Sequence, residues 1–295
     1  MIPLIFNGGV YGHQEFEDLV HDLGGFVIMK NFAQTEVTIF FIVPEEDIER
    51  VKEKALELKA ELKEAPLAGS EIAVVVPTIS IYHLPHNSCD VAEYLRRKGA
   101  KTNMVGLSRG VGKRLSRLTA FERDLINEHD VAVFLFGNFK ECVSEKIGKM
   151  VRDITIPVVA TGFPKIEPPE GVEYVPNLGR IVGKFSRDSD IELLENVAKA
   201  VERQVEKRRR IFERFDVPPY YLKVEIENQI PEIEESPSPA PVTVKIDGLR
   251  VKLPYEKFAE RIRNVRILDF KLEDICNVLP SVVEGHTLVR FWGAF

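Results

Sequence analysis

The chain has 295 residues, of which 44% are hydrophobic and 29% are charged, a composition typical of a soluble protein with room for two or three domains. Its net charge of −6 argues against a nucleic-acid partner, because phosphate contacts demand a basic surface. No apolar run reaches the roughly 20 residues that span a bilayer, so we expect no membrane partner. Residues 1–6 lack the features of a signal peptide, and three widely spaced cysteines indicate no disulfide framework. We therefore expect a cytoplasmic protein.

Residues 1–68 alternate between strand and helix patterns in the order βαββαβ. This order predicts a ferredoxin-like domain, in which two helices cover one face of an antiparallel sheet. The turn at Asn7, Gly8 and Gly9, with His13 beside it, is interpreted as a loop and a helix start rather than a ligand site. The predicted elements are a strand near Leu4, a helix at 14–23, strands at 26–30 and 36–43, a helix at 45–59 and a strand near Glu61.

A second domain is expected over residues 69–216, after the proline and glycine near residue 66. It begins with a buried strand at 72–76 and a polar loop that contains His86. Ser88 is predicted to cap a helix that runs to Lys98 and carries Cys89 in its first turn.

The next predicted strand, at 101–107, leads into a loop with two glycines and three basic side chains. Such a loop can hold a phosphate or another anion, and a solvated basic turn is about as good an interpretation. It lacks the ending of a Walker motif. A capping box of Thr119 and Glu122 then predicts the start of a helix. The proposed anion ligands are Ser108, Arg109, Gly110, Gly112 and Lys113.

The centre of this domain is a βαβ unit with apolar strands at 131–136 and 156–161. It predicts a parallel, Rossmann-like sheet. The turn of Gly137 and Asn138 would lie at the carboxyl end of a strand, where open α/β sheets place their ligands. Cys142 follows in the first turn of the next helix, and a helix N-terminus favours a thiolate.

Cys89 and Cys142 thus occupy equivalent positions at the starts of two helices. If their strands are neighbours, both thiols lie at one edge of the sheet. Two thiolates and the imidazole of His86 would suit a soft metal or an iron–sulfur cluster. The spacing is no metal signature, however, and each cysteine can equally be a small buried apolar residue.

The rest of the chain is read as an edge strand at 172–175, a further strand at 180–182 and a long helix at 188–215. The basic run at 207–210 is interpreted as a solvated helix end rather than a nucleic-acid site. Residues 217–241 form an acidic, proline-rich linker by composition. A small α+β module is predicted over 242–295, with a hairpin at Asp247 and Gly248 and helices at 255–265 and 270–278. Cys276 is assigned to its core.

The stretch from His86 to Thr161, with Cys89, five residues, then Leu95 and Arg96, and with the Gly137–Asn138 turn, resembles the C protein encoded with methyl-coenzyme M reductase in methanogenic archaea. The whole chain is similar to the methanogenesis marker protein 7 family, relatives of that C protein. The resemblance implies a subunit of the ATP-dependent complex that reductively activates methyl-coenzyme M reductase, an electron-transfer assembly with nitrogenase-type iron–sulfur clusters. The C-protein family has a cysteine that matches Cys89, whereas Cys142 departs from its pattern.

The partners implied are the C protein, other methanogenesis marker proteins, methyl-coenzyme M reductase and an ABC-type ATPase, which would hydrolyse ATP so that this chain binds no nucleotide directly. The sequence has no Ser-His-Asp order, no HExxH and no P-loop, so we expect a non-catalytic subunit. Two cysteines are too few for a four-cysteine cluster, so a cluster would be shared with a partner chain. The alternatives are a regulatory module for a phosphate-bearing ligand and a purely structural scaffold.

Overall fold

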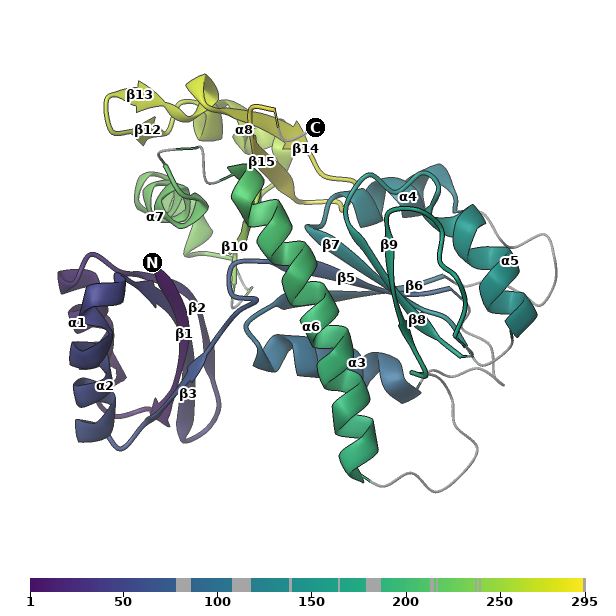
Figure 1. The fold of residues 1–295 in the computed structure, drawn as a ribbon. Helices are drawn as coiled ribbons and strands as arrows, with labels where there is room; N and C mark the ends of the chain where they lie inside the picture. The colour runs from purple at the N-terminus through teal and green to yellow at the C-terminus, as the bar shows by residue number, and fades with distance from the viewer. Residues whose placement is uncertain are drawn as a thin grey trace. The chain divides into compact units, whose positions relative to one another are not determined.

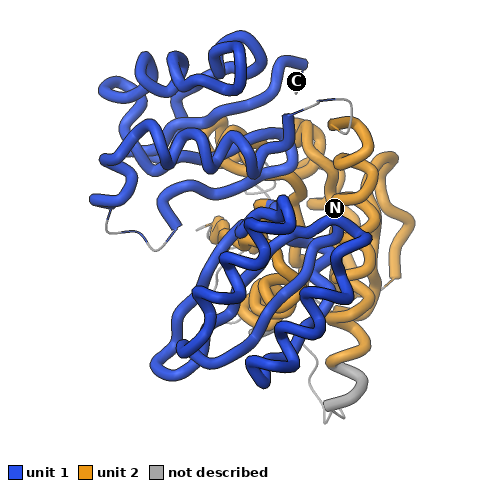
Figure 2. The backbone as a smooth tube through the Cα atoms, turned by 90° about the vertical axis from the view of Figure 1, so that its left-hand side faces the viewer, with its two compact units in different colours: residues 1–70, 214–295 blue, residues 71–213 orange. Residues whose placement is uncertain are grey.

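The computed structural model describes residues 1–77, 86–107, 118–137, 140–163, 165–178, 187–212, 215, 217–236, 238 and 240–293. Within three of the helices, the side chains of residues 86–87, 141–142 and 187–190 lie outside this description. The chain divides into two compact units, which Figure 2 colours separately: residues 1–70 with 214–295, and residues 71–213. The two ends of the chain therefore belong to the same unit.

The first 70 residues form an antiparallel sheet in the order β2-β3-β1-β4, with two helices on one face (Figure 1). Phe16 and Val20 on the first helix, and Val51 and Ala55 on the second, are four residues apart and therefore share a helix face. They pack against the strands in one apolar cluster. The predicted ferredoxin-like fold is confirmed. Its elements are β1 Ile2–Gly9, α1 His13–Asp22, β2 Phe26–Phe32, β3 Glu36–Val43, η1 Glu45–Asp47, α2 Ile48–Glu57 and β4 Glu61–Glu64.

The C-terminal residues add a second antiparallel sheet to this unit, in the order β10-β11-β15-β14. The helix predicted at 270–278 is wrong, because this segment forms a short strand, a 3-10 turn and the beginning of β14. Short apolar runs do not distinguish helix from strand, and pairing with β15 decides the outcome. The elements are β10 Val242–Lys245, β11 Gly248–Val251, α8 Tyr255–Arg263, β12 Arg266–Ile267, β13 Phe270–Lys271, η4 Leu272–Asp274, β14 Cys276–Pro280 and β15 Thr287–Phe291.

The predicted hairpin turn at Asp247 and Gly248 is present between β10 and β11. Gly248 has a φ of 144°, and a Cβ atom there would lie 2.0 Å from the carbonyl oxygen of Val289 on the neighbouring strand. Only glycine fits this position, because the strands approach each other so closely.

The segment predicted as an acidic, proline-rich linker, 217–241, contains α7 Pro219–Gln229 and the 3-10 helix η3 Pro231–Ile233. Pro219 occupies the first helical position, which tolerates proline because the N–H there has no helical partner. Leu222, Ile226 and Ile233 are buried, and the Tyr220 ring packs on Phe26 of β2 with 4.8 Å between ring centroids. Composition alone missed these apolar anchors. The C-terminal module is joined to residues 1–70 by this helix.

The aromatic end of the chain is partly packed. Phe291 is buried and stacks on Phe215 with 4.6 Å between ring centroids. Trp292 remains 51% exposed, and its Nε1–H donates to the carbonyl of Glu273 over 3.2 Å. Phe295 lies outside the described residues.

Residues 71–213 contain a five-stranded sheet in the order β6-β5-β7-β8-β9, and every neighbouring pair is parallel. The predicted Rossmann-like sheet is therefore confirmed, and β9 is the edge strand that the sequence indicated. The strand predicted at 180–182 lies outside the described residues. The elements are β5 Glu71–Val76, α3 His86–Arg97, β6 Lys101–Gly106, α4 Ala120–Asn127, β7 Val131–Leu135, α5 Lys140–Val151, β8 Val158–Gly162, β9 Val172–Pro176 and α6 Arg187–Phe212.

Helices cover both faces of the parallel sheet (Figure 1). On one face, Ile126 of α4 and Ile147 of α5 join a core cluster with Val75 and Phe134. On the other face, α3 and α6 contact each other. Strands buried on both sides read as continuous apolar runs, which is why β5 and β7 were predicted from sequence.

Polar side chains are buried at the amino ends of these strands. Asp130 Oδ2 accepts the backbone N–H of Glu71 over 2.8 Å, and the Glu71 carboxylate accepts from Asn103 Nδ2 over 2.8 Å. Asn103 also lies 3.0 Å from Nε2 of His129, whose Nδ1–H donates to the carbonyl of Leu125 over 3.0 Å. His129 lies just past the end of α4, and its ring is buried.

None of the helices in the described parts of the chain combines the length and apolar character that a membrane span requires.

Candidate functional site at the carboxyl edge of the parallel sheet

The strand order of the parallel sheet reverses at β5. From β5 the chain moves to β6 on one side, and then returns to β7 on the other side of β5. Open α/β sheets bind their ligands beyond the carboxyl ends of the strands at such a reversal point. The edge beyond Val76 and Leu135 is therefore the candidate site, and the helices that follow these two strands are the ones that carry Cys89 and Cys142.

Cys89 is an exposed residue in the first turn of α3. The helix begins at His86, two residues before the cap predicted at Ser88, so Ser88 lies within the helix and is buried. The thiol nevertheless keeps the predicted position near the positive end of the helix dipole. Its exposure is what a ligand or a partner chain would need.

Cys142 lies in the first turn of α5, at the same edge of the sheet as Cys89. The neighbouring strands that the two-thiol hypothesis requires are present. However, α5 packs on the face that carries Val75 and Phe134, whereas α3 covers the other face with α6. The two helix starts therefore flank the edge from opposite faces. The side chains of Cys142 and His86 lie outside the described residues, so their part in a metal site stays a prediction.

The other predicted ligands lie largely outside the described residues. This holds for the whole anion loop, with Ser108, Arg109, Gly110, Gly112 and Lys113, and for Asn138 of the turn. Gly137 is described and exposed, and its carbonyl accepts the N–H of Phe163 over 3.2 Å. A Cβ atom on Gly137 would meet no atom within 4 Å. Packing within the described residues therefore does not require a glycine there.

Gly162, which the sequence did not single out, has little room for a side chain at this edge. A Cβ atom on Gly162 would lie 3.1 Å from Cβ of Phe136 and 3.2 Å from the carbonyl oxygen of Gly137. The close approach lets β8 extend alongside the end of β7, where Phe136 N–H donates to the Thr161 carbonyl over 2.7 Å. Gly162 therefore lies where the ends of β7 and β8 approach each other closely.

Thr161, also missed from sequence, places a polar group at the carboxyl end of β8. Its side chain is fully buried, and within the described structure its hydroxyl oxygen Oγ1 has no hydrogen-bond partner. Thr161 is in register with Leu135, while its neighbour Ala160 belongs to the cluster under α4 and α5. Because side chains alternate along a strand, Thr161 faces the α3 and α6 side, where Cys89 lies. A single hydroxyl in the apolar run 158–161 was the signal available.

Cys276 is buried, whereas Cys89 is exposed. It lies buried on β14, as predicted for a core residue although not on the predicted helix, and burial raises the pKa of its thiol to about 12. A thiol that stays protonated is a poor nucleophile and a poor metal ligand. Cys276 is therefore excluded from the candidate site.

The basic run at 207–210 is less solvated than the sequence suggested. Arg208 Nε lies 3.6 Å from Oδ1 of the buried Asp130. Desolvation lowers the pKa of Arg209, partly offset by the charges of Glu206 and Asp130. Only part of this run is available to solvent, so it supports neither a nucleic-acid surface nor a fully solvated helix end.

No group of three or more histidine, cysteine, aspartate and glutamate side chains is arranged to hold a metal ion among the described residues. Among the three residues predicted as metal ligands, only the side chain of Cys89 is described, and the side chains of His86 and Cys142 are not. A cluster at this edge would thus draw on those two residues and on another polypeptide.

Comparisons with known proteins give one family and one relative. The family described as methyl-coenzyme M reductase operon protein C matches residues 1–265. A protein of Methanocaldococcus jannaschii, described as uncharacterized, is 42% identical over 288 residues, which cover 97% of this chain and 92% of the relative.

Two solved structures show a distant likeness to the chain. A formyltetrahydrofolate deformylase from Pseudomonas putida is 9% identical, with a TM-score of 0.24, over 76% of this chain and 73% of that chain. A glutamyl-tRNA reductase from Methanopyrus kandleri is 11% identical, with a TM-score of 0.20, over 79% of this chain and 85% of that chain.

Proposed function

The chain belongs to the methyl-coenzyme M reductase operon protein C family, and from this membership we propose that it is a non-catalytic subunit of the ATP-dependent complex that reductively activates methyl-coenzyme M reductase. The family itself associates the chain with that reductase and with methanogenesis. The finer proposal is that the carboxyl edge of the parallel sheet contributes thiolate ligands to an iron–sulfur cluster within that complex.

The observation that carries the proposal is the position of Cys89. Its thiol is exposed in the first turn of α3, beside the point where the strand order reverses. A soft thiolate is the ligand that iron–sulfur clusters use. Cys142 begins the helix after the neighbouring strand β7, and His86 is the first residue of α3, so both are placed at the same edge.

The donor set implies that the cluster is shared. Clusters of the common types take four cysteine ligands, whereas the chain offers Cys89 and Cys142 at this edge and keeps Cys276 buried. The remaining ligands would come from a separate chain, either the C protein that is encoded with the reductase or another methanogenesis marker protein. A cluster held in this way would pass electrons toward methyl-coenzyme M reductase, and a separate ABC-type protein would hydrolyse ATP.

The test is made on the activation complex purified without oxygen from cells that express variants of this chain. Cys89→Ser and Cys142→Ser are compared with Cys276→Ala, a variant outside the candidate site. We expect each serine variant to lower the iron content of the complex and to change its EPR signal, while Cys276→Ala leaves both as in the wild type.

Complexes that assemble normally and keep the same iron content and EPR signal with both Cys89 and Cys142 replaced would overturn the cluster proposal. Co-purification of the C protein is measured in the same samples. If the variants retain the C protein but lose iron, the thiols serve the cluster rather than the assembly. If the wild-type chain fails to co-purify with the C protein or the reductase at all, the subunit assignment is wrong.

A further inference from the structure

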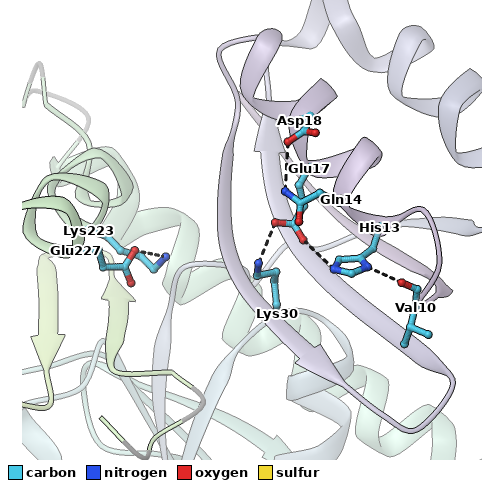
Figure 3. Close-up of polar contacts among 8 residues, drawn as sticks. All are labelled: Val10, His13, Gln14, Glu17, Asp18, Lys30, Lys223 and Glu227. Carbon is cyan, nitrogen blue, oxygen red and sulfur yellow. Dashed lines mark hydrogen bonds and ion pairs between the residues drawn. The ribbon is translucent and has the colours of Figure 1, made fainter. Parts of the chain in front are cut away.

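Three polar side chains, two on the first turns of α1 and one on β2, lie close together. Figure 3 shows His13 and Glu17 on α1, and Lys30 on β2, with the carboxylate of Glu17 between the two nitrogen-bearing side chains. Lys30 Nζ donates to Glu17 Oε2 over 2.9 Å, and His13 Nε2 lies 3.9 Å from Glu17 Oε1. The cluster belongs to the unit of residues 1–70 and 214–295, whereas Cys89 belongs to the other unit.

The tautomer of His13 is fixed by its other ring nitrogen. Nδ1 lies 2.6 Å from the carbonyl oxygen of Val10. A carbonyl oxygen only accepts hydrogen bonds, so Nδ1 must carry the hydrogen and donate it. In the neutral ring, Nε2 then presents a lone pair toward Glu17.

Glu17 presents a second acceptor to the same space. Its side chain is only 6% exposed, and among the described residues its Oε1 atom has no hydrogen-bond partner. Two acceptors that face each other over 3.9 Å gain nothing from the contact, and a buried carboxylate oxygen without a donor costs free energy. A positively charged group between Nε2 and Oε1 removes this cost.

We infer that His13 and Glu17 form an exchangeable site for a divalent transition-metal ion such as Zn²⁺, bound through Nε2 and Oε1. Residues four apart on a helix lie on one face, which is the spacing at which side-chain pairs chelate metals. Zinc–ligand distances of about 2.0–2.2 Å place two ligand atoms about 3.4 Å apart around a tetrahedral ion. The 3.9 Å separation is about 0.5 Å longer than this spacing, so the two side chains would have to close slightly around the ion.

The hydrogen-bond partners of the two side chains match those that usually support metal ligands. Metal-binding histidines usually donate their second ring N–H to a carbonyl or carboxylate, and metal-binding carboxylates are held by a further hydrogen bond. Val10 and Lys30 play these two parts. As no third His, Cys, Asp or Glu of the described chain completes a metal-binding group, water would fill the remaining positions. The site is therefore open and weak.

Lys30 also opposes the binding of a second cation, because its ammonium group shares the same carboxylate. This opposition gives a specific expectation. Lys30→Gln keeps a hydrogen-bond donor toward Oε2 and removes the charge, so it should bind metal more tightly than the wild type. A merely structural ion pair would give no such gain.

The experiment titrates Zn²⁺ into the full-length chain in a Cys89→Ser, Cys142→Ser background, which removes competing thiols. The readout is the imidazole resonances of selectively labelled histidine in NMR spectra, with His13 assigned by His13→Gln. We expect sub-millimolar Zn²⁺ to shift the His13 signal in a saturable manner. Glu17→Gln should weaken binding at least about tenfold, and Asp18→Asn, an exposed neighbour on the same helix, should leave it unchanged.

Glu17 is buried, so Glu17→Gln is first checked for native circular dichroism. If it unfolds, calorimetric titration of His13→Gln, which changes a partly exposed ring, tests the same site by loss of the binding heat. A His13 signal that responds to pH but not to Zn²⁺ shows that a proton alone fills the gap and overturns the inference. A Zn²⁺ response that survives removal of the Glu17 carboxylate, or that does not strengthen in Lys30→Gln, overturns it as well.

Discussion

The two edges of the parallel sheet are formed by opposite ends of the same strands, but they differ in how their polar groups are buried and hydrogen-bonded. At the amino edge the polar residues Asp130, Glu71 and His129 are buried. The Asp130 carboxylate accepts the backbone N–H of Glu71, and the His129 ring donates to the carbonyl of Leu125. At the carboxyl edge, Cys89 is exposed, and in the described structure the Thr161 hydroxyl has no partner. The buried hydrogen bonds at the amino edge thus stabilise the fold, whereas the carboxyl edge is the side on which open α/β sheets bind their ligands.

The largest expected difference is between the reactivities of two thiols. Cys89 lies at the carboxyl edge of the parallel sheet, and Cys276 is buried in the other unit. In a Cys142→Ser background, Cys89 and Cys276 are the cysteines that remain. Burial raises the pKa of Cys276 to about 12, so at about pH 8 its thiolate fraction is about one in ten thousand. We expect iodoacetamide to label Cys89 at least about a thousandfold faster in the native protein.

Mass spectrometry of tryptic peptides after timed labelling measures both rates in one sample. Addition of urea is the control, because the two thiols should react at similar rates once the chain unfolds. Equal labelling of the two thiols in the folded protein would contradict the assignment of Cys276 to the core and of Cys89 to an accessible edge.

The second prediction concerns the loss of a buried carboxylate at the amino edge. Asp130→Ala removes the acceptor of the Glu71 N–H and the charge that faces Arg208, whose side chain is 11% exposed. Removing one partner of a buried ion pair costs about 3–5 kcal/mol, because the other charge stays buried. We expect the free energy of unfolding to fall by about 3 kcal/mol in urea denaturation.

Asp124→Ala is the matched control, because Asp124 forms an exposed pair with Arg123. Its removal should change the free energy of unfolding by less than about 0.5 kcal/mol. A loss at Asp130 no larger than the loss at Asp124 would show that the amino edge does not stabilise the fold in the way described.

The third prediction compares one chemical change at both edges. Thr102, at the start of β6, accepts from Arg96 Nε over 2.8 Å and donates to the Ala92 carbonyl over 3.3 Å. Thr102→Val should lower the free energy of unfolding by about 1–2 kcal/mol, because it leaves the Arg96 donor without its acceptor. Thr161→Val removes a buried hydroxyl that has no partner in the described chain, so it should raise the free energy of unfolding by up to about 1 kcal/mol.

The two valine variants are compared by urea denaturation of the isolated chain. The sign of the change is the result that matters, since threonine and valine have nearly the same shape. If Thr161→Val destabilises the protein as much as Thr102→Val, the Thr161 hydroxyl has a partner and is not held for a ligand.

The amino edge could be anticipated from sequence only in part, and the reasons are physical. Local signals were sufficient where a residue interacts with its sequence neighbours. The Thr119–Glu122 capping box is present with both of its hydrogen bonds, and the buried strand of residues 72–76 is β5. The contact of Asp130 with Arg208 joins residues far apart in the chain, so no local pattern predicts it.

The same distinction explains the errors. A helix was predicted at 270–278, but non-local pairing with β15 makes Cys276 and Val278 part of a strand. The linker prediction failed because proline and acidic composition concealed Leu222 and Ile226, which α7 buries. At the candidate site, the positions of Cys89 and Gly137 followed from the βαβ pattern, but the role of Gly162 depends on a close approach between two strands that sequence cannot show.

The smallest expected effect concerns the α3–α6 contact, which joins helices that both begin at the carboxyl edge. Tyr94 O–H donates to Glu195 over 2.6 Å, and Lys98 Nζ donates to the same carboxylate over 3.1 Å. The Tyr94 hydrogen bond is the main cause that lowers the pKa of Glu195, against the opposing effect of desolvation. The charged carboxylate is therefore stabilised in the folded state.

A lowered pKa in the folded state means that this stabilisation is present above the unfolded pKa, near the ordinary value of 4.5, and is lost as pH falls through the folded pKa. Tyr94→Phe should thus lower the free energy of unfolding by less than about 1 kcal/mol at neutral pH, and the difference from the wild type should shrink as the pH falls below 4.5. Urea midpoints at neutral and acid pH measure it, with Tyr11→Phe, at a ring that is 93% exposed, as the control. A difference that persists unchanged in acid would mean that the Tyr94 hydroxyl stabilises the contact between α3 and α6 without involving the charge of Glu195. The contact would then resemble the neutral packing on the faces of the sheet rather than the charged interactions at its amino edge.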